Sequence, residues 1–328
     1  MKRVAINGLG RIGRASLKII QDTPELDLVA VNDIAPIDNI AYLLKYDTVH
    51  GIYEKSVEVN NGKLDVDGNS IPYFSERDPS QLPWEDLKID VVIESTGFFT
   101  NQEDAEKHIK AGAKTVVLSG PTKSPDVPTV VHGVNTDDGK TNVFSCASCT
   151  TNNISPVIEI LGRRIGIEKA IMTTIHADTA SNKTVDSPSS NHRMGRSALN
   201  NIIPTTTGAA KATTKALPQY GGKFDGMAVR VPVAVGSLSD ITLVTSQNTS
   251  AEEVNEILIQ EANTDRYNQV FKATYDELVS SDIIKSPYAS IADLSMTKVV
   301  DGNLLKVLTW YDNEWGFTNQ MIRQILEL

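Results

Sequence analysis

The chain has 328 residues, which is enough for two domains of ordinary size. Lys and Arg total 31 against 41 Asp and Glu, and the resulting net charge of −10 has the wrong sign for a protein whose main partner is nucleic acid. The 40% apolar content excludes a disordered or collagen-like chain, and no apolar run reaches the roughly 18 residues of a membrane-spanning helix. Two cysteines cannot form a secreted disulfide scaffold, and no signal peptide is evident, so we expect a reducing compartment.

Short apolar strands alternate with helical segments over the first 150 residues, which is typical of a parallel sheet with crossover helices. Between them, residues 56–74 carry Asn-Gly at 61–62 and Asp-Gly at 67–68 within alternating apolar and polar residues, which predicts an antiparallel hairpin insertion. The predicted strands are residues 4–6, 28–31, 91–93 and 115–118, and the predicted helices are 14–20 and 103–111.

The second half of the chain has longer predicted strands, which favours an α+β domain. Residues 178–207 are rich in Ser, Thr and Asn and show little periodicity, so we expect a long functional loop there. The predicted strands are 169–175, 226–235, 241–246 and 304–311, and the predicted helices are 153–161 and 318–328.

A glycine-rich turn follows the first predicted strand. The residues Gly8, Gly10 and Gly13 match the G-x-G-x-x-G pattern, a helix follows them, and Asp33 stands 20 residues after Gly13 at the end of the next strand. Such glycines let the backbone approach a pyrophosphate at a helix amino terminus, and the carboxylate accepts hydrogen bonds from the adenosine ribose. Asp33 would repel a 2′-phosphate, which favours NAD and leaves NADP use open. The alternative interpretation is a tight turn in another kind of α/β protein.

Cys149 precedes a segment whose apolar residues have helical spacing, so we expect its thiol at a helix amino terminus, where the helix dipole lowers the pKa of a cysteine. His176 follows the predicted strand 169–175 and is the candidate base for this thiol. The alternative for His176 is a structural role in the core.

Cys146 and Cys149 form a C-x-x-C pair. A zinc site would need two further ligands at suitable spacing, which the sequence does not offer, so we predict no metal site. Disulfide exchange remains open, although a small buried residue is the favoured interpretation of Cys146.

Seven segments make the chain resemble the phosphorylating glyceraldehyde-3-phosphate dehydrogenases over essentially its full length. The resemblance implies oxidation of D-glyceraldehyde 3-phosphate to 1,3-bisphosphoglycerate with inorganic phosphate and NAD, through a thioester on Cys149. It also implies a cytoplasmic homotetramer that acts in glycolysis or gluconeogenesis. The matching segments are residues 4–14, 44–47, 119–121, 147–152, 206–211, 230–232 and 310–316.

The resemblance also implies individual site residues. Cys149 is implied as the nucleophile and His176 as its base. Besides the three glycines of the turn, the cofactor contacts implied are Arg11, Ile12, Asp33, Arg77, Ser119 and Asn313. The substrate phosphate is assigned to Thr179 and Arg230, and the attacking inorganic phosphate to Ser148, Thr150, Thr207 and Gly208.

The chain departs from the family's usual pattern near these residues. Asp178 stands where the family usually has Tyr, Cys146 where it often has Asn, and Asn153 where it often has Cys. Ser187 replaces a bulkier residue that is common in strictly NAD-using members, which weakens the cofactor argument from Asp33. The alternative functions are an erythrose-4-phosphate dehydrogenase, a semialdehyde dehydrogenase, and a non-catalytic NAD-binding or thiol-sensing protein.

Taken together, these features predict a Rossmann-type parallel-sheet cofactor domain over residues 1–148 and an α+β catalytic domain with a mostly antiparallel sheet over 149–312. The carboxyl-terminal helix within 313–328 is expected to pack back on the first domain.

Overall fold

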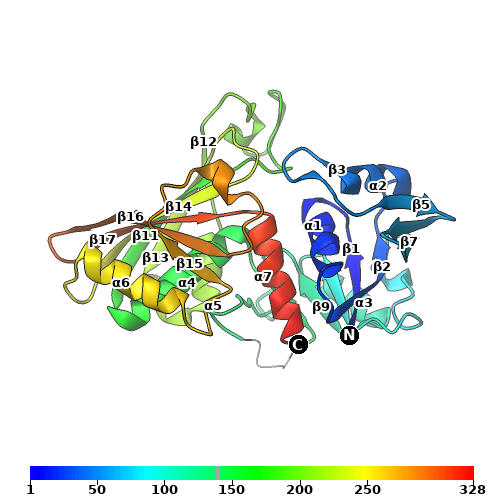
Figure 1. The fold of residues 1–328 in the computed structure, drawn as a ribbon, viewed down its shortest axis with the longest axis horizontal. Coiled ribbons are helices and arrows are strands. Elements are labelled where there is room, and N and C mark those ends of the chain that lie inside the picture. The colour runs from blue at the N-terminus through cyan, green and yellow to red at the C-terminus, as the bar shows by residue number, and fades with distance from the viewer. Residues whose placement is uncertain (137–140) are drawn as a thin grey trace. The chain divides into compact units, whose positions relative to one another are not determined.

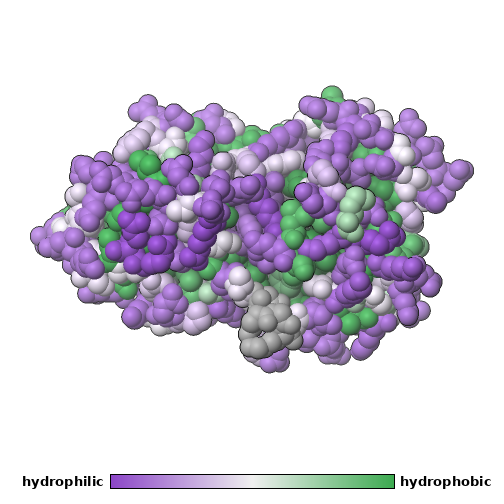
Figure 2. All heavy atoms as spheres, turned by 60° about the horizontal axis from the view of Figure 1, so that its bottom comes forward, coloured by the Kyte–Doolittle hydropathy of each residue, from purple (hydrophilic) through white to green (hydrophobic). Residues whose placement is uncertain are grey.

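The computed structural model describes residues 1–136 and 141–328, which form two compact units (Figure 1). The first unit contains residues 1–130, the described part of 137–147, and residues 321–328. The second contains residues 131–136 and 148–320. Hydrophilic side chains cover most of the face drawn in Figure 2, as the charged composition leads us to expect.

An eight-stranded sheet forms the centre of the first unit. Its strands are β1 (Lys2–Asn7), β2 (Leu26–Asn32), β5 (Val57–Asn60), β6 (Lys63–Val66), β7 (Asn69–Phe74), β8 (Val91–Glu94), β9 (Thr115–Leu118) and β10 (Val143–Ser145). They run in the order β10-β9-β8-β1-β2-β7-β6-β5. From β10 to β7 neighbouring strands are parallel, and β8 is buried along its whole length, which explains the apolar run of residues 91–93. The helices are α1 (Arg11–Ile20), α2 (Ile37–Lys45) and α3 (Gln102–Lys110), and β3 (Tyr46–Asp47) pairs with β4 (Gly51–Ile52) in a separate small hairpin.

The predicted hairpin insertion is present at the edge of this sheet. Strand β6 pairs antiparallel with both β5 and β7. Both connecting turns place two successive residues at positive φ, at 52° and 72° for Asn61 and Gly62, and at 55° and 84° for Asp67 and Gly68. Two-residue turns of this kind match the twist of the strands that they join, which is why the Asn-Gly and Asp-Gly pairs located them in the sequence.

A seven-stranded mixed sheet forms the second unit. Its strands are β11 (Ile167–His176), β12 (Ile203–Thr206), β13 (Phe224–Arg230), β14 (Ser237–Thr245), β15 (Phe271–Thr274), β16 (Ser290–Val300) and β17 (Leu304–Tyr311). In the order β12-β13-β11-β14-β17-β16-β15, only the pairs β13–β11 and β16–β15 are parallel among the described strands. The predicted fold class, a parallel-sheet cofactor domain followed by a mostly antiparallel α+β domain, is therefore confirmed.

The two faces of this second sheet differ. Helices α4 (Cys149–Arg164), α5 (Ala209–Ala216) and α6 (Ala251–Ala262) pack on one face, where buried residues alternate along β14 and β17. On the other face, Ile171 of β11 and Met227 of β13 are 61% and 43% exposed. The strict alternation shows that one face of the sheet is core and the other is open in the single chain.

Two element boundaries differ from the sequence prediction. The strand predicted for residues 226–235 ends at Arg230, because Pro232 has no N–H for a further ladder bond and Gly236 turns the chain at a φ of +96°. Helix α4 begins at Cys149 rather than at residue 153, because Ser148 caps it by accepting a hydrogen bond from the Thr151 N–H at 3.1 Å.

The last helix, α7 (Trp315–Leu326), starts in the second unit, and its residues from Met321 onward belong to the first. Within the first unit the Lys2 ammonium donates hydrogen bonds to the carbonyls of Ile325 and Leu326, at 2.9 and 2.8 Å. These bonds satisfy carbonyl groups at the end of a helix, which have no partner within it. Among the described residues, no helix has the length and apolar character needed to cross a bilayer.

Candidate active site

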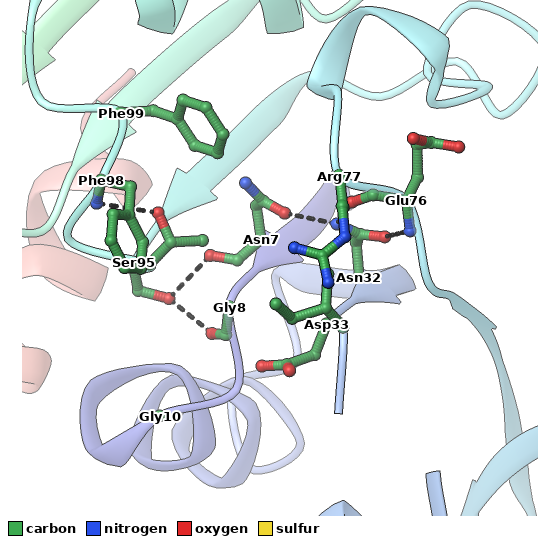
Figure 3. Close-up of a pocket in the computed structure, with 12 residues that line it drawn as sticks. Asn7, Gly8, Gly10, Asn32, Asp33, Glu76, Arg77, Ser95, Phe98 and Phe99 are labelled. Atoms are coloured by element: carbon green, nitrogen blue, oxygen red, sulfur yellow. Dashed lines mark hydrogen bonds between the residues drawn. The ribbon is translucent and has the colours of Figure 1, made fainter. Parts of the chain in front are cut away.

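A cavity of about 530 Å³ opens at the carboxyl ends of β1, β2 and β8 in the first unit (Figure 3). Phe98 and Phe99 lie on one side of it, and Asp33 and Arg77 on the other. The carboxyl ends of parallel strands are where open α/β sheets bind their ligands. The cavity is lined by Asn7, Gly8, Gly10, Asn32, Asp33, Ile34, Glu76, Arg77, Ser95, Thr96, Phe98 and Phe99.

The three glycines of the turn have three different surroundings. A Cβ on Gly8, whose φ is +92°, would lie 2.7 Å from the Thr96 nitrogen. A Cβ on Gly13 would lie 1.9 Å from the carbonyl oxygen of Gly8, so this position joins the helix tightly to the strand. Gly10 caps α1 and has no atom within 4 Å of its Cβ position, so its surroundings leave room for a ligand at the helix amino terminus.

Asp33 stands at the end of β2 and is held by the backbone. Its carboxylate accepts hydrogen bonds from the N–H of Leu9 at 2.6 Å and from that of Ala35 at 2.9 Å. Because no side chain caps α1, the amino terminus of that helix also retains the donors that a pyrophosphate needs. The carboxylate on the cavity wall, the open space at Gly10 and the free helix terminus fit NAD.

A buried hydrogen-bond network holds two of the residues that line the cavity. The Trp84 N–H donates to Nδ1 of His108 at 3.0 Å, so the proton of this neutral imidazole is on Nε2, which donates to Glu94 at 3.1 Å. The Glu94 carboxylate also accepts from the Asn7 amide at 2.5 Å and from the Thr96 N–H at 2.8 Å. Asn7 and Thr96 line the cavity, so the core network fixes two residues of its wall.

The other predicted cofactor residues divide into two groups. Arg77 lines the cavity, whereas Arg11 of the first turn of α1 pairs with Asp47 at 2.5 Å. Asn313 belongs to the second unit, where its side-chain amide oxygen accepts hydrogen bonds from the Gly236 N–H and the Ser237 hydroxyl at 3.2 and 3.0 Å. Among the described residues, Arg11, Ile12, Gly13 and Ser119 lie outside the lining of this cavity.

Two glycine substitutions separate the folding role of this turn from its binding role. We expect Gly10→Ala to leave the melting temperature near that of the wild type and to weaken NAD binding at least tenfold, because the added methyl group occupies the open space at the helix terminus. We expect Gly13→Ala to lower the free energy of unfolding by about 2 kcal/mol or more, because its methyl group meets the Gly8 carbonyl. Calorimetric titration with NAD and thermal unfolding measure the two effects, and equal NAD affinity in Gly10→Ala would contradict the expectation.

The second unit brings Cys149 and His176 together. Cys149 is the first residue of α4, and His176 is the last residue of β11. The Sγ atom of Cys149 lies 3.4 Å from Nε2 of His176. Nδ1 of His176 lies 2.7 Å from the Ala177 carbonyl oxygen. In the tautomer that carries the proton on Nδ1, this carbonyl accepts it and Nε2 presents its lone pair to the thiol.

Surrounding groups fix the position of this imidazole. The ring of Tyr311 packs edge-on against it with a centroid separation of 6.0 Å, and the Tyr311 hydroxyl bonds to those of Thr150 and Thr174. The guanidinium of Arg230 donates to the Ala177 carbonyl at 3.0 Å, and its Nη1 lies 2.5 Å from Nδ1 of His176. The strand register places Arg230 directly opposite His176, which is why the two side chains meet.

The pKa shifts of Cys149 and His176 favour a neutral thiol beside a neutral imidazole. Burial and then the charge of Arg230 lower the pKa of His176 from 6.5 to about 4, against the opposing effect of the Ala177 hydrogen bond. Burial raises the pKa of the Cys149 thiol, although hydrogen bonds from Thr150 and the charge of Arg230 lower it. The expectation of a lowered thiol pKa from the helix terminus alone was therefore wrong, because the loss of solvent outweighs the helix and its neighbours. The thiol needs His176 as a base to lose its proton.

The lowered pKa of His176 predicts an acid-dependent loss of stability. The unfolded chain binds a proton on this residue below about pH 6.5, while the folded chain stays neutral there down to about pH 4. We expect the unfolding free energy of the wild type, relative to His176→Gln, to fall by about 3 kcal/mol as the pH falls from 6.5 to 4. Urea unfolding of both proteins across this range measures the difference, and parallel pH profiles would contradict it.

The four residues predicted for the inorganic phosphate lie near the amino termini of two helices. Ser148 caps α4, and the Thr207 hydroxyl accepts a hydrogen bond from the Ala209 N–H at 3.2 Å beside Gly208, the cap of α5. Helices α4 and α5 pack together through the hydroxyls of Ser155 and Thr213. Free N–H groups at helix amino termini are donors for phosphate oxygens.

The hydroxyls of Thr150 and Thr179 have partners within the protein. The hydroxyl of Thr150 is bound by Tyr311 at 2.9 Å, and it is the least available of the predicted phosphate ligands. The hydroxyl of Thr179 bonds to that of Ser181 at 2.8 Å and lies 3.3 Å from the amide oxygen of Asn182.

Both cysteines are free thiols. Cys146 is buried, and burial raises the pKa of its thiol far above the ordinary range. Within residues 1–136 and 141–328, no group of three or more His, Cys, Asp or Glu side chains is arranged to hold a metal ion.

The fold and the dinucleotide cavity define the class: the protein is an NAD-dependent dehydrogenase. The family model of the glyceraldehyde 3-phosphate dehydrogenase NAD binding domain matches residues 2–102, and the model of the C-terminal domain of the same enzyme matches residues 148–313. The chain belongs to the glyceraldehyde-3-phosphate dehydrogenase family.

Curated relatives agree with the family models over nearly the whole chain. The chain is 44% identical to the glyceraldehyde-3-phosphate dehydrogenase of Clostridium pasteurianum, over 99% of this chain and 98% of the relative. It is 45% identical to glyceraldehyde-3-phosphate dehydrogenase 2 of Streptomyces avermitilis, over 98% and 96% of the two chains. It is 44% identical to the glyceraldehyde-3-phosphate dehydrogenase of Clostridium acetobutylicum, over 99% and 98%.

Sequence reasoning missed several residues that shape the two sites. Glu94 was identifiable in principle, because it is a carboxylate at the carboxyl end of a predicted parallel strand. His108 and Trp84 carried no such signal, since their contact joins positions 24 residues apart in the chain. Tyr311 lay within a segment used for the family resemblance, but its contact with His176 comes only from the folded arrangement, in which its side chain meets α4 and the side chains of β11.

Proposed function

We propose that the chain catalyses the phosphorylating oxidation of D-glyceraldehyde 3-phosphate to 1,3-bisphosphoglycerate, with reduction of NAD. The observation that carries this proposal is the 3.4 Å approach of the Cys149 sulfur to the imidazole of His176, in a chain of this family. A thiol and a neutral imidazole at this distance are an activated nucleophile and its base.

The chemistry starts at the sulfur. Nε2 of His176 takes the thiol proton as the sulfur of Cys149 attacks the aldehyde carbon, which forms a hemithioacetal. The Cys149 N–H, at the start of α4, and the protonated imidazole stabilise the oxygen of this intermediate. Oxidation of the hemithioacetal to a thioester on Cys149 requires a hydride acceptor, which NAD would supply when held by Asp33 and the glycine turn of the first unit.

Phosphate then completes the reaction. An oxygen of inorganic phosphate attacks the thioester carbon, and the carbon–sulfur bond breaks. The acyl phosphate is released, and the sulfur of Cys149 remains as a thiolate. The imidazolium of His176 donates a hydrogen bond to the carbonyl oxygen in this step. We assign the inorganic phosphate to Ser148, Thr150, Thr207 and Gly208, on the support of the two helix termini, and the substrate phosphate to Thr179 and Arg230.

The oxidation requires the sulfur. We expect Cys149→Ser to lower kcat about 10⁴-fold or more, because a serine hydroxyl is far less acidic than a thiol, while NAD binding stays unchanged. NADH formation from glyceraldehyde 3-phosphate, phosphate and NAD measures kcat, with Cys146→Ala as the matched thiol control and erythrose 4-phosphate as the competing substrate. Normal turnover in Cys149→Ser would refute covalent catalysis at this residue, and better turnover of erythrose 4-phosphate would favour that alternative enzyme.

We also propose a homotetramer that works in the cytoplasm. The open face of the second sheet presents Ile171, Ile175, Met227 and Val229 beside the Asp240–Lys306 ion pair, and a face of this kind suits a second copy of the chain. Two free thiols, one of them assigned to catalysis, suit a reducing compartment.

The open face gives a test of the assembly. We expect Ile171→Glu to dissociate the tetramer into smaller species. Ile171 is 61% exposed in the single chain, and the substitution would place a carboxylate within the apolar contact between copies. Ile259→Glu, on the exposed side of α6 and 38% exposed, is the matched control. Sedimentation velocity measures the mass of each species, and an intact tetramer in Ile171→Glu would exclude this face from the interface.

A further inference from the structure

Three buried polar atoms near the end of β11 have no hydrogen-bond partner within the described part of the chain. They are Oδ1 of Asp178, Nε of Arg230 and Nδ2 of Asn182. An unsatisfied buried polar atom costs about 1–3 kcal/mol, so a group of one acceptor and two donors without partners requires an explanation. All three residues lie in or beside the site proposed for the substrate phosphate.

Backbone hydrogen bonds hold Asp178 against the segment that follows Arg230. The Val231 N–H donates to the His176 carbonyl at 3.1 Å, and the Asp178 N–H donates to the Val233 carbonyl at 2.8 Å. Arg230 itself reaches back to the Ala177 carbonyl at 3.0 Å. The two segments therefore run together beyond the ends of their strands, and the Asp178 carboxyl is confined near the Arg230 guanidinium.

The charges of Asp178 and Arg230 act on each other. Burial raises the pKa of Asp178, and the only opposing influence is the positive charge of Arg230. No ion pair joins the two among the described residues, so neither side chain neutralises the other by direct contact. His176 and Cys149 are the other titratable groups affected by the Arg230 charge, and burial together with that charge lowers the pKa of His176 to about 4.

A negative charge next to a phosphate-binding arginine opposes the binding of phosphate. The carboxylate of Asp178 offsets part of the positive potential of Arg230, and it repels a phosphate group directly. An aldehyde without a phosphate group escapes this repulsion. The product of the reaction keeps the same phosphate group, so the repulsion also favours its release.

We propose that Asp178 is a specificity-determining residue of the substrate-phosphate site, whose carboxylate weakens the binding of phosphorylated aldehydes relative to unphosphorylated ones. This inference rests on the proposed function, in which Arg230 binds the substrate phosphate. Asp178 acts on the Michaelis constant and not on the chemical step, because it contacts neither the thiol nor the imidazole in the described hydrogen-bond pattern.

The test compares two substrates and two aspartates. Wild type, Asp178→Asn and the matched control Asp186→Asn are assayed at pH 8 and low ionic strength with glyceraldehyde 3-phosphate and with glyceraldehyde. Asp186 lies on the loop that follows Asp178, is paired with Arg196 at 2.9 Å on the surface, and loses the same charge. For Asp178→Asn we expect KM for glyceraldehyde 3-phosphate to fall about three- to tenfold, with KM for glyceraldehyde and both kcat values within about twofold of wild type. Asp186→Asn should match the wild type with both substrates.

Other results would overturn the inference. An unchanged or raised KM for glyceraldehyde 3-phosphate in Asp178→Asn, or an equal fall of KM for both aldehydes, excludes the proposed repulsion. Thermal unfolding checks that Asp178→Asn is folded, and Asp178→Ser, which also removes the charge, replaces it if it is not. Arg230→Gln separates this failure from that of the proposed function: if it raises KM for glyceraldehyde 3-phosphate alone, the phosphate site stands and only the role of Asp178 falls. If Arg230→Gln leaves that KM unchanged, the phosphate assignment itself is wrong.

Discussion

The contact between the Cys149 sulfur and Nε2 of His176 is the interaction on which the proposed chemistry depends. Neither partner is reactive by itself, because burial raises the pKa of the thiol and lowers that of the imidazole. The same burial that keeps both groups neutral also provides the low-dielectric site in which proton transfer between them can accompany bond formation. The activation is therefore a property of the pair and of the groups that orient it.

Arg230 couples the two functions of the second unit. Opposite His176 in the strand ladder, it fixes the Ala177 carbonyl that orients the imidazole, and its charge lowers the pKa of His176. The same guanidinium is our candidate ligand for the substrate phosphate, and a bound phosphate would offset part of that charge. Substrate binding and the basicity of His176 are thus linked through one side chain.

The first unit provides a rigid cavity wall against which a flexible dinucleotide can bind. The contact between Gly13 and the Gly8 carbonyl joins helix to strand, while the buried carboxylate of Glu94 fixes Asn7 and Thr96. Buried polar networks of this kind are rigid only when every member has a partner. His108 is a partner of Glu94, and Trp84 in turn is a partner of His108. Rigidity of the cavity reduces the entropy that binding must overcome.

Local signals in the sequence determined much of this protein: the glycine turn, the carboxylate of Asp33 at the end of a strand, the two hairpin turns, and the thiol near a helix start all depend on residues close together in the chain. The partners of those residues depended on tertiary structure, because the strand register that sets Arg230 opposite His176 and the packing that sets Trp84 on His108 join distant segments. The direction of the Cys149 pKa shift also depended on tertiary structure. A helix terminus can be inferred from spacing, but the extent of burial that outweighs it is decided only when the chain has folded.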